Sequence, residues 1–206
     1  LTDVADVELY QVGYASMSNS ATYCLDYSAT VSNWTFTRIT SRLYVHYYDW
    51  SGTSAARPLH FQGTFTDVAR LDLRAEAYTT YQAMKDSTFT DTRIEVTPSS
   101  SSSRRMDMSN NTFIDSQIEL KASSGSSSTG LILRDSTFSS TKAPPTTGSW
   151  TDYYIDGNDY GKWVIQNNSF TPANGWKNLR YTYNIGNMQA PYNWWGTNNV
   201  TTIDGL

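Results

Sequence analysis

The chain has 206 residues, a net charge of -4 and only 17% charged residues, and its polar character comes from Ser, Thr, Asn and fifteen Tyr. No basic stripe is visible, which speaks against a nucleic-acid-binding protein. An aromatic fraction of 14% is too high for a disordered polar tract, so the chain is expected to fold. No run of about eighteen apolar residues exists, so no membrane span is predicted.

The single cysteine, Cys24, excludes an internal disulfide framework and any metal site made only of cysteines. We interpret it as a small buried hydrophobic residue. Asn-x-Ser/Thr triplets begin at Asn33, Asn110, Asn167 and Asn199. The sequence begins with Leu1 and shows neither an initial methionine nor a basic and apolar leader. These features, together with the triplets and the low charge, indicate a processed segment of a secreted or cell-surface protein.

Six phenylalanines recur in nearly the same sequence context, as in Asn33-Trp34-Thr35-Phe36 and Asn110-Asn111-Thr112-Phe113. Their separations are 29, 24, 24, 25 and 32 residues. A period in the twenties predicts a solenoid, in which each repeat is one coil that buries its apolar face against its neighbours. The six are Phe36, Phe65, Phe89, Phe113, Phe138 and Phe170.

Short segments of alternating apolar and polar residues accompany the phenylalanines, among them residues 71–73, 94–96, 118–120, 131–133 and 163–165. Alternation with period two predicts about two or three short strands in each coil. A helical solenoid is disfavoured because the segments are too short and too rich in β-branched residues. We therefore expect an all-β, single-domain parallel β-helix over residues 1–206, of about eight coils, with clear repeats over 31–196.

Alignment on phenylalanine produces two polar columns. The residues just before it are Thr35, Thr64, Thr88, Thr112, Thr137 and Ser169. The residues three before it are Asn33, Gln62, Asp86, Asn110, Asp135 and Asn167. In a solenoid, equivalent residues lie above one another, so we expect the phenylalanines to stack inside while the amides and hydroxyls form hydrogen-bond ladders at the bend.

Three polar segments interrupt the repeat: residues 97–103, residues 123–128, and an excursion that begins at Ala143-Pro144-Pro145. The repeat resumes in register after each of them. We expect flexible loops that project from one side of the rod.

These coils resemble the right-handed parallel β-helix repeat family, whose bends carry an Asn/Asp-Asn/Ser-x-Phe motif. Near the end of the chain, the segment Tyr192-Asn193-Trp194-Trp195-Gly196 is similar to the Asn-Tyr-Trp-Gly type ending of secreted and surface members. The resemblance implies right-handed coils. Since such members usually continue into a cap, residues 197–206 are expected to be a truncated C-terminal segment that favours end-to-end or side-by-side assembly.

The family also includes polysaccharide lyases, hydrolases, epimerases and phage tailspikes. The resemblance would place catalysis in strings such as Gly-His-Gly, Asp-Pro-His-Asp or Trp-x-Asp-His, and none of them occurs. His46 and His60 lie next to aromatic residues in strand-like alternation. Either is a conceivable general base, but we interpret both as ordinary strand residues and assign no catalytic residue.

Two acidic columns also emerge from the alignment. One consists of Asp67, Asp91 and Asp115, and the other of Asp72, Glu95 and Glu119. Carboxylates stacked about 5 Å apart repel one another unless a cation lies between them, so calcium is a candidate ligand of the first column. The alternative is that the first column makes turn hydrogen bonds while the second is screened by Arg74, Arg93 and Lys121.

Tyr and Trp present flat apolar faces with a polar edge, which suits either sugar rings or a protein interface. The candidates for such a face are Tyr44, Tyr47, Tyr48, Trp50, Tyr153, Tyr154 and Trp176. We therefore expect a structural or adhesive protein that self-associates or binds another surface protein. The alternative is a carbohydrate-active β-helix, either lyase-like or a tailspike-like glycan-binding domain, that binds a polysaccharide through the acidic columns and the aromatic face.

Overall fold

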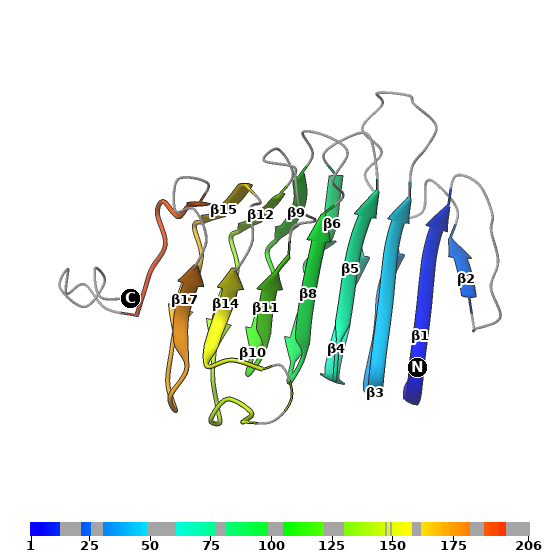
Figure 1. The fold of residues 1–206 in the computed structure, drawn as a ribbon, viewed down its shortest axis with the longest axis horizontal. Helices are drawn as coiled ribbons and strands as arrows, with labels where there is room; N and C mark the ends of the chain where they lie inside the picture. Colours follow the sequence, from blue (N-terminus) through cyan, green and yellow to red (C-terminus); the bar gives the residue numbers. More distant parts are fainter. Residues whose placement is uncertain are drawn as a thin grey trace.

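A computed structural model describes most of the chain. The described residues are 1–12, 22–25, 31–48, 61–76, 81–98, 105–121, 130–146, 148, 150–157, 162–181 and 188–196. All pairings between their strands are parallel, and the strands lie side by side along the long axis of the molecule (Figure 1). This confirms the prediction of an all-β parallel solenoid. Within this part of the chain, no helix is long and apolar enough to cross a membrane.

The strands form three faces. The charged face contains β5 (Leu71–Glu76), β8 (Arg93–Pro98), β11 (Gln117–Leu120), β14 (Tyr153–Gly157) and β17 (Lys177–Tyr181). The phenylalanine face contains β4 (Phe61–Val68), β7 (Thr88–Thr90), β10 (Thr112–Ile114), β13 (Thr137–Ser139) and β16 (Ser169–Thr171). The third face contains β6 (Tyr81–Lys85), β9 (Arg105–Ser109), β12 (Gly130–Arg134), β15 (Lys162–Gln166) and β18 (Met188–Gln189).

The N-terminal part differs because its strands are longer. It consists of β1 (Thr2–Val12), β2 (Thr22–Leu25) and β3 (Val31–Tyr48). Strand β3 runs through two faces without a break, since it pairs with β4 through residues 31–39 and with β5 through residues 43–48. The first repeats therefore lack the three separate strands of the later ones.

Complete turns with one strand on every face begin at β6, β9, β12 and β15. The structure thus has about four such turns, and the prediction of about eight coils is wrong. The phenylalanine period counts the levels of one column, and it does not reveal that β3 passes from face to face as a single strand. We use "level" for the residues at the height of one ring in this column.

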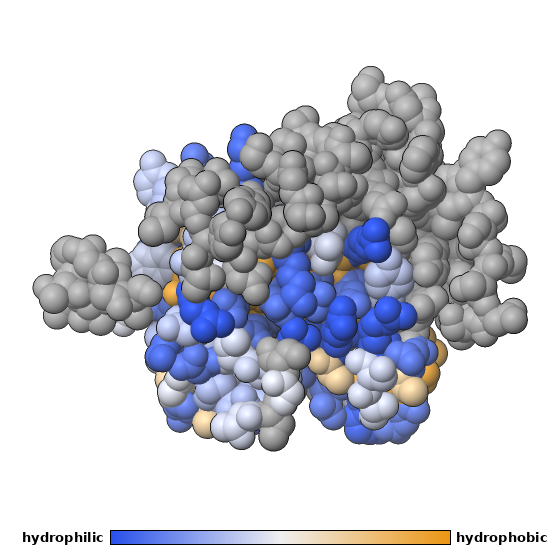
Figure 2. All heavy atoms as spheres, in the orientation of Figure 1, coloured by the Kyte–Doolittle hydropathy of each residue, from blue (hydrophilic) through white to orange (hydrophobic). Residues whose placement is uncertain are grey.

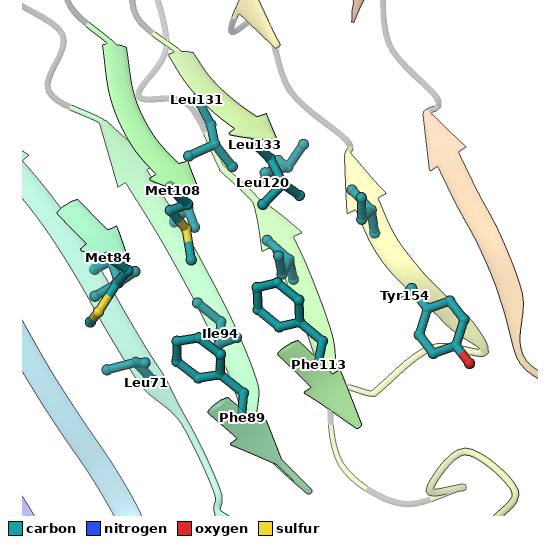
Figure 3. Packing of buried hydrophobic residues seen from close by; sticks show 14 of the residues in the cluster. Leu71, Met84, Phe89, Ile94, Met108, Phe113, Leu120, Leu131, Leu133 and Tyr154 are labelled. Atoms are coloured by element: carbon teal, nitrogen blue, oxygen red, sulfur yellow. The ribbon is translucent and has the colours of Figure 1, made fainter. Parts of the chain in front are cut away.

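The core is organised around that column. The six phenylalanines are 0–1% exposed, and successive ring centroids lie 4.5–5.3 Å apart with interplanar angles of 7–13°. Trp195 adds a seventh ring, 4.8 Å from Phe170 and inclined by 11°. In Figure 3, Ile94 and Met108 lie near Phe89 and Phe113 within the buried cluster. The ending Tyr192-Asn193-Trp194-Trp195 is therefore one more copy of the bend motif, in which tryptophan replaces phenylalanine.

The Asn/Asp columns occupy bends of left-handed backbone conformation. Asp86, Asn110, Asp135 and Asn167 have φ angles of 52–55°, and Asp67, Asp91 and Asp115 have φ angles of 50–55°. Asn and Asp tolerate this region better than other residues with a Cβ atom, because their short polar side chains make local hydrogen bonds there. The backbone conformation thus explains why both columns contain Asn and Asp.

In the Asn/Asp column, Asn110 donates a side-chain hydrogen bond to Asp86 of the preceding level, and a second, buried ladder lies one residue further along the chain. At each level a Ser or Asn side chain accepts a hydrogen bond from the backbone N–H of the preceding level. The donor and acceptor pairs are Gly63–Ser87, Ser87–Asn111, Asn111–Ser136, Ser136–Asn168 and Asn168–Asn193, at 2.9–3.1 Å. A buried backbone N–H needs such a partner, so this column fixes the register between levels.

The excursion that begins at Ala143 is anchored where it leaves the rod and where it returns. The Ser140 hydroxyl exchanges hydrogen bonds with Ala173, at 2.9 and 3.0 Å. The indole N–H of Trp176 donates to the Lys142 carbonyl at 2.9 Å, and Trp150 lies edge-on to Trp176. The two ends of the excursion are therefore held against the rod, whereas Ala143, Thr146 and Gly148 between them are exposed. The serine-rich residues 99–103 and 123–128 lie outside the described residues.

We expect Phe113→Ala to lower the free energy of unfolding by about 3–5 kcal/mol, because it leaves a cavity in the middle of the stack. The outward-facing control Thr112→Ala should stay within about 0.5 kcal/mol of the wild type. Urea denaturation of both variants measures the difference. Equal losses for the two variants would show that the ring column does not carry the core.

Candidate functional site

The charged face aligns four acidic side chains in one row. Strand pairing places Asp72 of β5 beside Glu95 of β8, then Glu119 of β11, then Asp156 of β14. Arg180 of β17 continues the row. We call these four acidic residues the charged row. The alignment had identified its first three members, whereas Asp156 lies beyond the long insertion that displaces the repeat.

Basic side chains neutralise the charged row. Arg70 pairs with Asp72 and, at 3.1 Å, with Glu95. Lys121 lies 2.9 Å from Glu95 and 3.3 Å from Glu119. Arg93 pairs with Glu119 and lies 3.7 Å from Glu95, and Arg180 pairs with Asp156. Arg93 and Lys121 had been predicted to screen the row, whereas Arg70 and Arg180 had not.

The network is unusually buried for the outward side of a sheet. Asp72, Arg93, Glu95 and Asp156 are only 5–8% exposed. In the space-filling view, hydrophilic residues form a band across the middle of the molecule (Figure 2). Removing a charge from water is costly unless the charge is paired, so each of these buried charges needs its partner.

Burial raises the pKa of Asp72 above its ordinary value, although the hydrogen bond and charge of Arg70 oppose the shift. A raised carboxyl pKa suits a general acid. However, each carboxylate of the charged row is ion-paired with a base. The arrangement therefore favours a structural ion-pair network over a site for proton transfer.

The Asp67, Asp91 and Asp115 column has a basic neighbour from its own chain. The Lys142 ammonium lies 2.5 Å from Asp91, and the hydrogen bond from Lys142 to Asp91, with the charges of Asp91, Asp115 and Asp67, raises the pKa of Lys142. Asp115 accepts hydrogen bonds from the Thr141 N–H at 2.7 Å and from its hydroxyl at 2.5 Å. Among the described residues, no three His, Cys, Asp or Glu side chains converge as a metal site requires. The Lys142 ammonium thus supplies the positive charge beside Asp91 that the calcium hypothesis assigned to a metal ion.

The predicted aromatic face is not continuous. Tyr154 is 0% exposed and Trp176 is 4% exposed, and their rings stack at 4.9 Å in the core. Tyr154 and Trp176 therefore belong to the core of the rod and not to an exposed aromatic face. The Tyr153 ring lies 5.1 Å from the cationic groups of both Lys177 and Arg180, and the Tyr44 ring lies 5.1 Å from that of Arg42.

Several predicted residues lie wholly or partly outside the described structure. Trp50, His60 and Asn199 are outside it altogether. For Cys24, His46, Tyr47 and Tyr48 only the strand position is described, in β2 and β3. The interpretations of these residues remain predictions.

A polar hollow of about 260 Å³ opens beside the phenylalanine face, and sequence analysis missed it. Its lining is Asn33, Trp34, Thr35, Gln62, Gly63, Thr64, Asp86 and Thr88. Gly63 takes the place that Ser or Asn occupies on the later levels and Trp34 occupies on the level before it, and a Cβ atom at Gly63 would approach the Trp34 carbonyl oxygen to 2.6 Å. The change from Ser or Asn to Trp34 and Gly63 on the first two levels is the sequence signal that marks the hollow.

No protein-family model, no curated protein and no solved structure matches this chain. The class that the geometry defines is a parallel β-solenoid with a neutralised charged face.

We expect Lys142→Met to make the melting temperature sensitive to calcium, because the carboxylates of Asp91 and Asp115 then lack the ammonium and take up an external cation. The wild type should respond less. Lys177→Met is the matched control, since it frees only Asp152, to which Lys177 is bonded at 2.6 Å. Identical calcium responses of the two variants in thermal scans would contradict the role of Lys142.

The raised pKa of Asp72 predicts a pH effect of definite sign. The folded state binds the proton at higher pH than the unfolded state does, so lowering the pH from 7 toward about 3.9 should stabilise the wild type relative to Asp72→Asn. Urea titrations of both proteins across this range measure the difference. A difference that stays constant, or moves in favour of the variant on acidification, would show that the shift is absent.

Proposed function

We propose that this chain is a right-handed parallel β-helix of a secreted or surface-displayed structural protein, and that it assembles end to end with further copies of itself. The observation that carries the proposal is the position of its exposed apolar side chains. In the described residues, the large hydrophobic side chains that are exposed are Leu1, Tyr192 and Trp194, at 46%, 85% and 43%. Tyr192 and Trp194 lie on the last level of the described rod, and Leu1 precedes β1, whose outer edge is covered by β2 only at Glu8–Gln11.

The two ends suit each other as partners. At the C-terminal end, Trp194 bridges to Ser169 and stands in the threonine column, while Tyr192 takes the left-handed bend position with a φ of 61°. At the other end, the Leu1 carbonyl accepts a hydrogen bond from the Thr37 N–H at 2.9 Å. Because all strands are parallel, head-to-tail contact would continue both the strand direction and the side-chain columns. Such a contact does not close on itself and therefore forms an open filament.

The compensation of charge along the rod supports a structural role over an enzymatic one. The four carboxylates of the charged row are paired, and Lys142 is paired with Asp91. A structural rod needs such internal pairing, whereas an active site needs a group that is available to the substrate.

One observation favours the carbohydrate-binding alternative. The hollow beside the phenylalanine face combines the indole of Trp34 with the amides of Asn33 and Gln62 and with threonine hydroxyls. Such a lining offers several hydrogen-bonding groups to the hydroxyls of a sugar. Titration with neutral monosaccharides, followed by Trp fluorescence, tests this alternative.

The assembly is tested by light scattering after size exclusion at increasing protein concentration. The wild type should grow in mass, and the double variant Tyr192→Asn, Trp194→Thr should remain monomeric. These two changes restore the Asn-Asn-Thr pattern of the other levels, so the fold should persist. Tyr153→Thr, on β14 and away from the exposed side chains of Tyr192 and Trp194, is the matched control and should assemble like the wild type. A wild type that stays monomeric throughout, or a double variant that assembles equally well, would refute the proposal.

A further inference from the structure

The outer surface of the phenylalanine face carries two parallel columns of small hydroxyl residues. Each strand reads Thr-Phe-Thr or a close variant, with the phenylalanine inside and its two neighbours outside. The first column is Thr35, Thr64, Thr88, Thr112, Thr137 and Ser169. The second column is Thr37, Thr66, Thr90, Ile114, Ser139 and Thr171. We call these twelve positions the hydroxyl array; Ile114 is its one residue without a hydroxyl, and no position carries a charge.

The array is a regular two-dimensional lattice. Across the strands its repeat follows that of the rings beneath, 4.5–5.3 Å. Along a strand, the two columns are separated by two residues, which is about 6.7 Å. Because the phenylalanines between them are fully buried and stacked, the lattice is held rigidly from below.

Most of these hydroxyls are not used by the protein itself. Within the described residues, no side-chain hydrogen bond involves the threonines of the first column, or Thr37, Thr66 or Thr90. Thr171 is an exception, since its hydroxyl donates to the Phe138 carbonyl at 3.0 Å. Hydroxyls at the bends behave differently: those of Ser116 and Ser136 each donate to a carbonyl at 2.8 Å. The array therefore presents unused hydroxyl groups to the solvent, with Thr35, Thr64 and Thr137 exposed.

We propose that the hydroxyl array binds the surface of ice. Oxygen atoms in hexagonal ice form rows whose two repeats are close to the spacings of the array across and along the strands. Threonine suits this surface because its hydroxyl anchors a water molecule, while its methyl group restricts the neighbouring waters without competing for hydrogen bonds. A rigid lattice orders this water before contact, so little entropy is lost on binding.

The residue types of the array favour ice over a soluble glycan chain. Neither column contains an aromatic side chain on which a sugar ring would stack. The polar hollow borders only the first column, at Thr35, Thr64 and Thr88, and leaves the second column outside its lining. The proposal does not depend on end-to-end assembly, because the array lies on a face of the rod and Trp194 lies at its end.

Two assays test the proposal. In the first, ice recrystallisation in a frozen sucrose solution is followed by microscopy, and the wild type should inhibit crystal growth. The double variant Thr88→Tyr, Thr112→Tyr, which we call the array variant, should lose this inhibition, because its two bulky rings lift the hydroxyl array away from the ice. Thr146→Tyr is the matched control: Thr146 is exposed, lies on the loop after Phe138, and stands outside the array. This control should inhibit like the wild type.

The second assay guards against variants that do not fold. The protein is labelled at its amino terminus, ice is grown slowly from the solution, and the concentrations in ice and liquid are compared. The wild type should be enriched in ice, and the single variant Thr64→Lys, at an exposed position, should be excluded. Circular dichroism checks each variant. Exclusion of the wild type from ice, or equal inhibition by the array variant and the Thr146→Tyr control, would overturn the proposal.

Discussion

The stacked aromatic column sets the height of every level in this protein. Its rings are 4.5–5.3 Å apart, a spacing close to that of hydrogen-bonded strands, about 4.8 Å, so stacking and strand pairing reinforce each other. Any residue at a fixed distance from the ring in sequence then falls into a vertical row. The charged row, the left-handed bends and the hydroxyl array are all consequences of this one constraint, although they differ in chemistry.

The sequence predicted what repeats and missed what does not. The phenylalanine period gave the parallel solenoid and aligned Asp72, Glu95 and Glu119, because periodicity fixes rows directly. It missed Trp195 as a stacked ring, since the motif there is carried by a different aromatic residue. The contact between Lys142 and Asp91 involves a residue next to an insertion. The insertion has no counterpart in the other repeats, so alignment of the repeats does not reveal this contact. Composition alone also does not separate Tyr154 and Trp176, which are core residues, from the more exposed Tyr153.

The charged row, the bend columns and the hydroxyl array differ in how far interactions within the protein account for their residue types. The charged row is compensated internally, because its buried charges need partners. The bend columns are chosen by backbone conformation, and their side chains are secondary to it. Only the hydroxyl array repeats a functional group that the protein leaves largely unused. A repeated residue is thus informative about function when no internal reason accounts for it.

The clasped loop after Phe138 gives the rod a mechanical asymmetry. Solenoids come apart most easily by peeling single coils from an end. Here Lys142 holds Asp91, beside Phe89, while its carbonyl accepts the indole N–H of Trp176, beyond Phe170. The loop therefore bridges four levels, from Phe89 to Phe170. A force that peels the chain from its C-terminal side meets this bridge before it reaches the middle of the rod, so these levels must yield together.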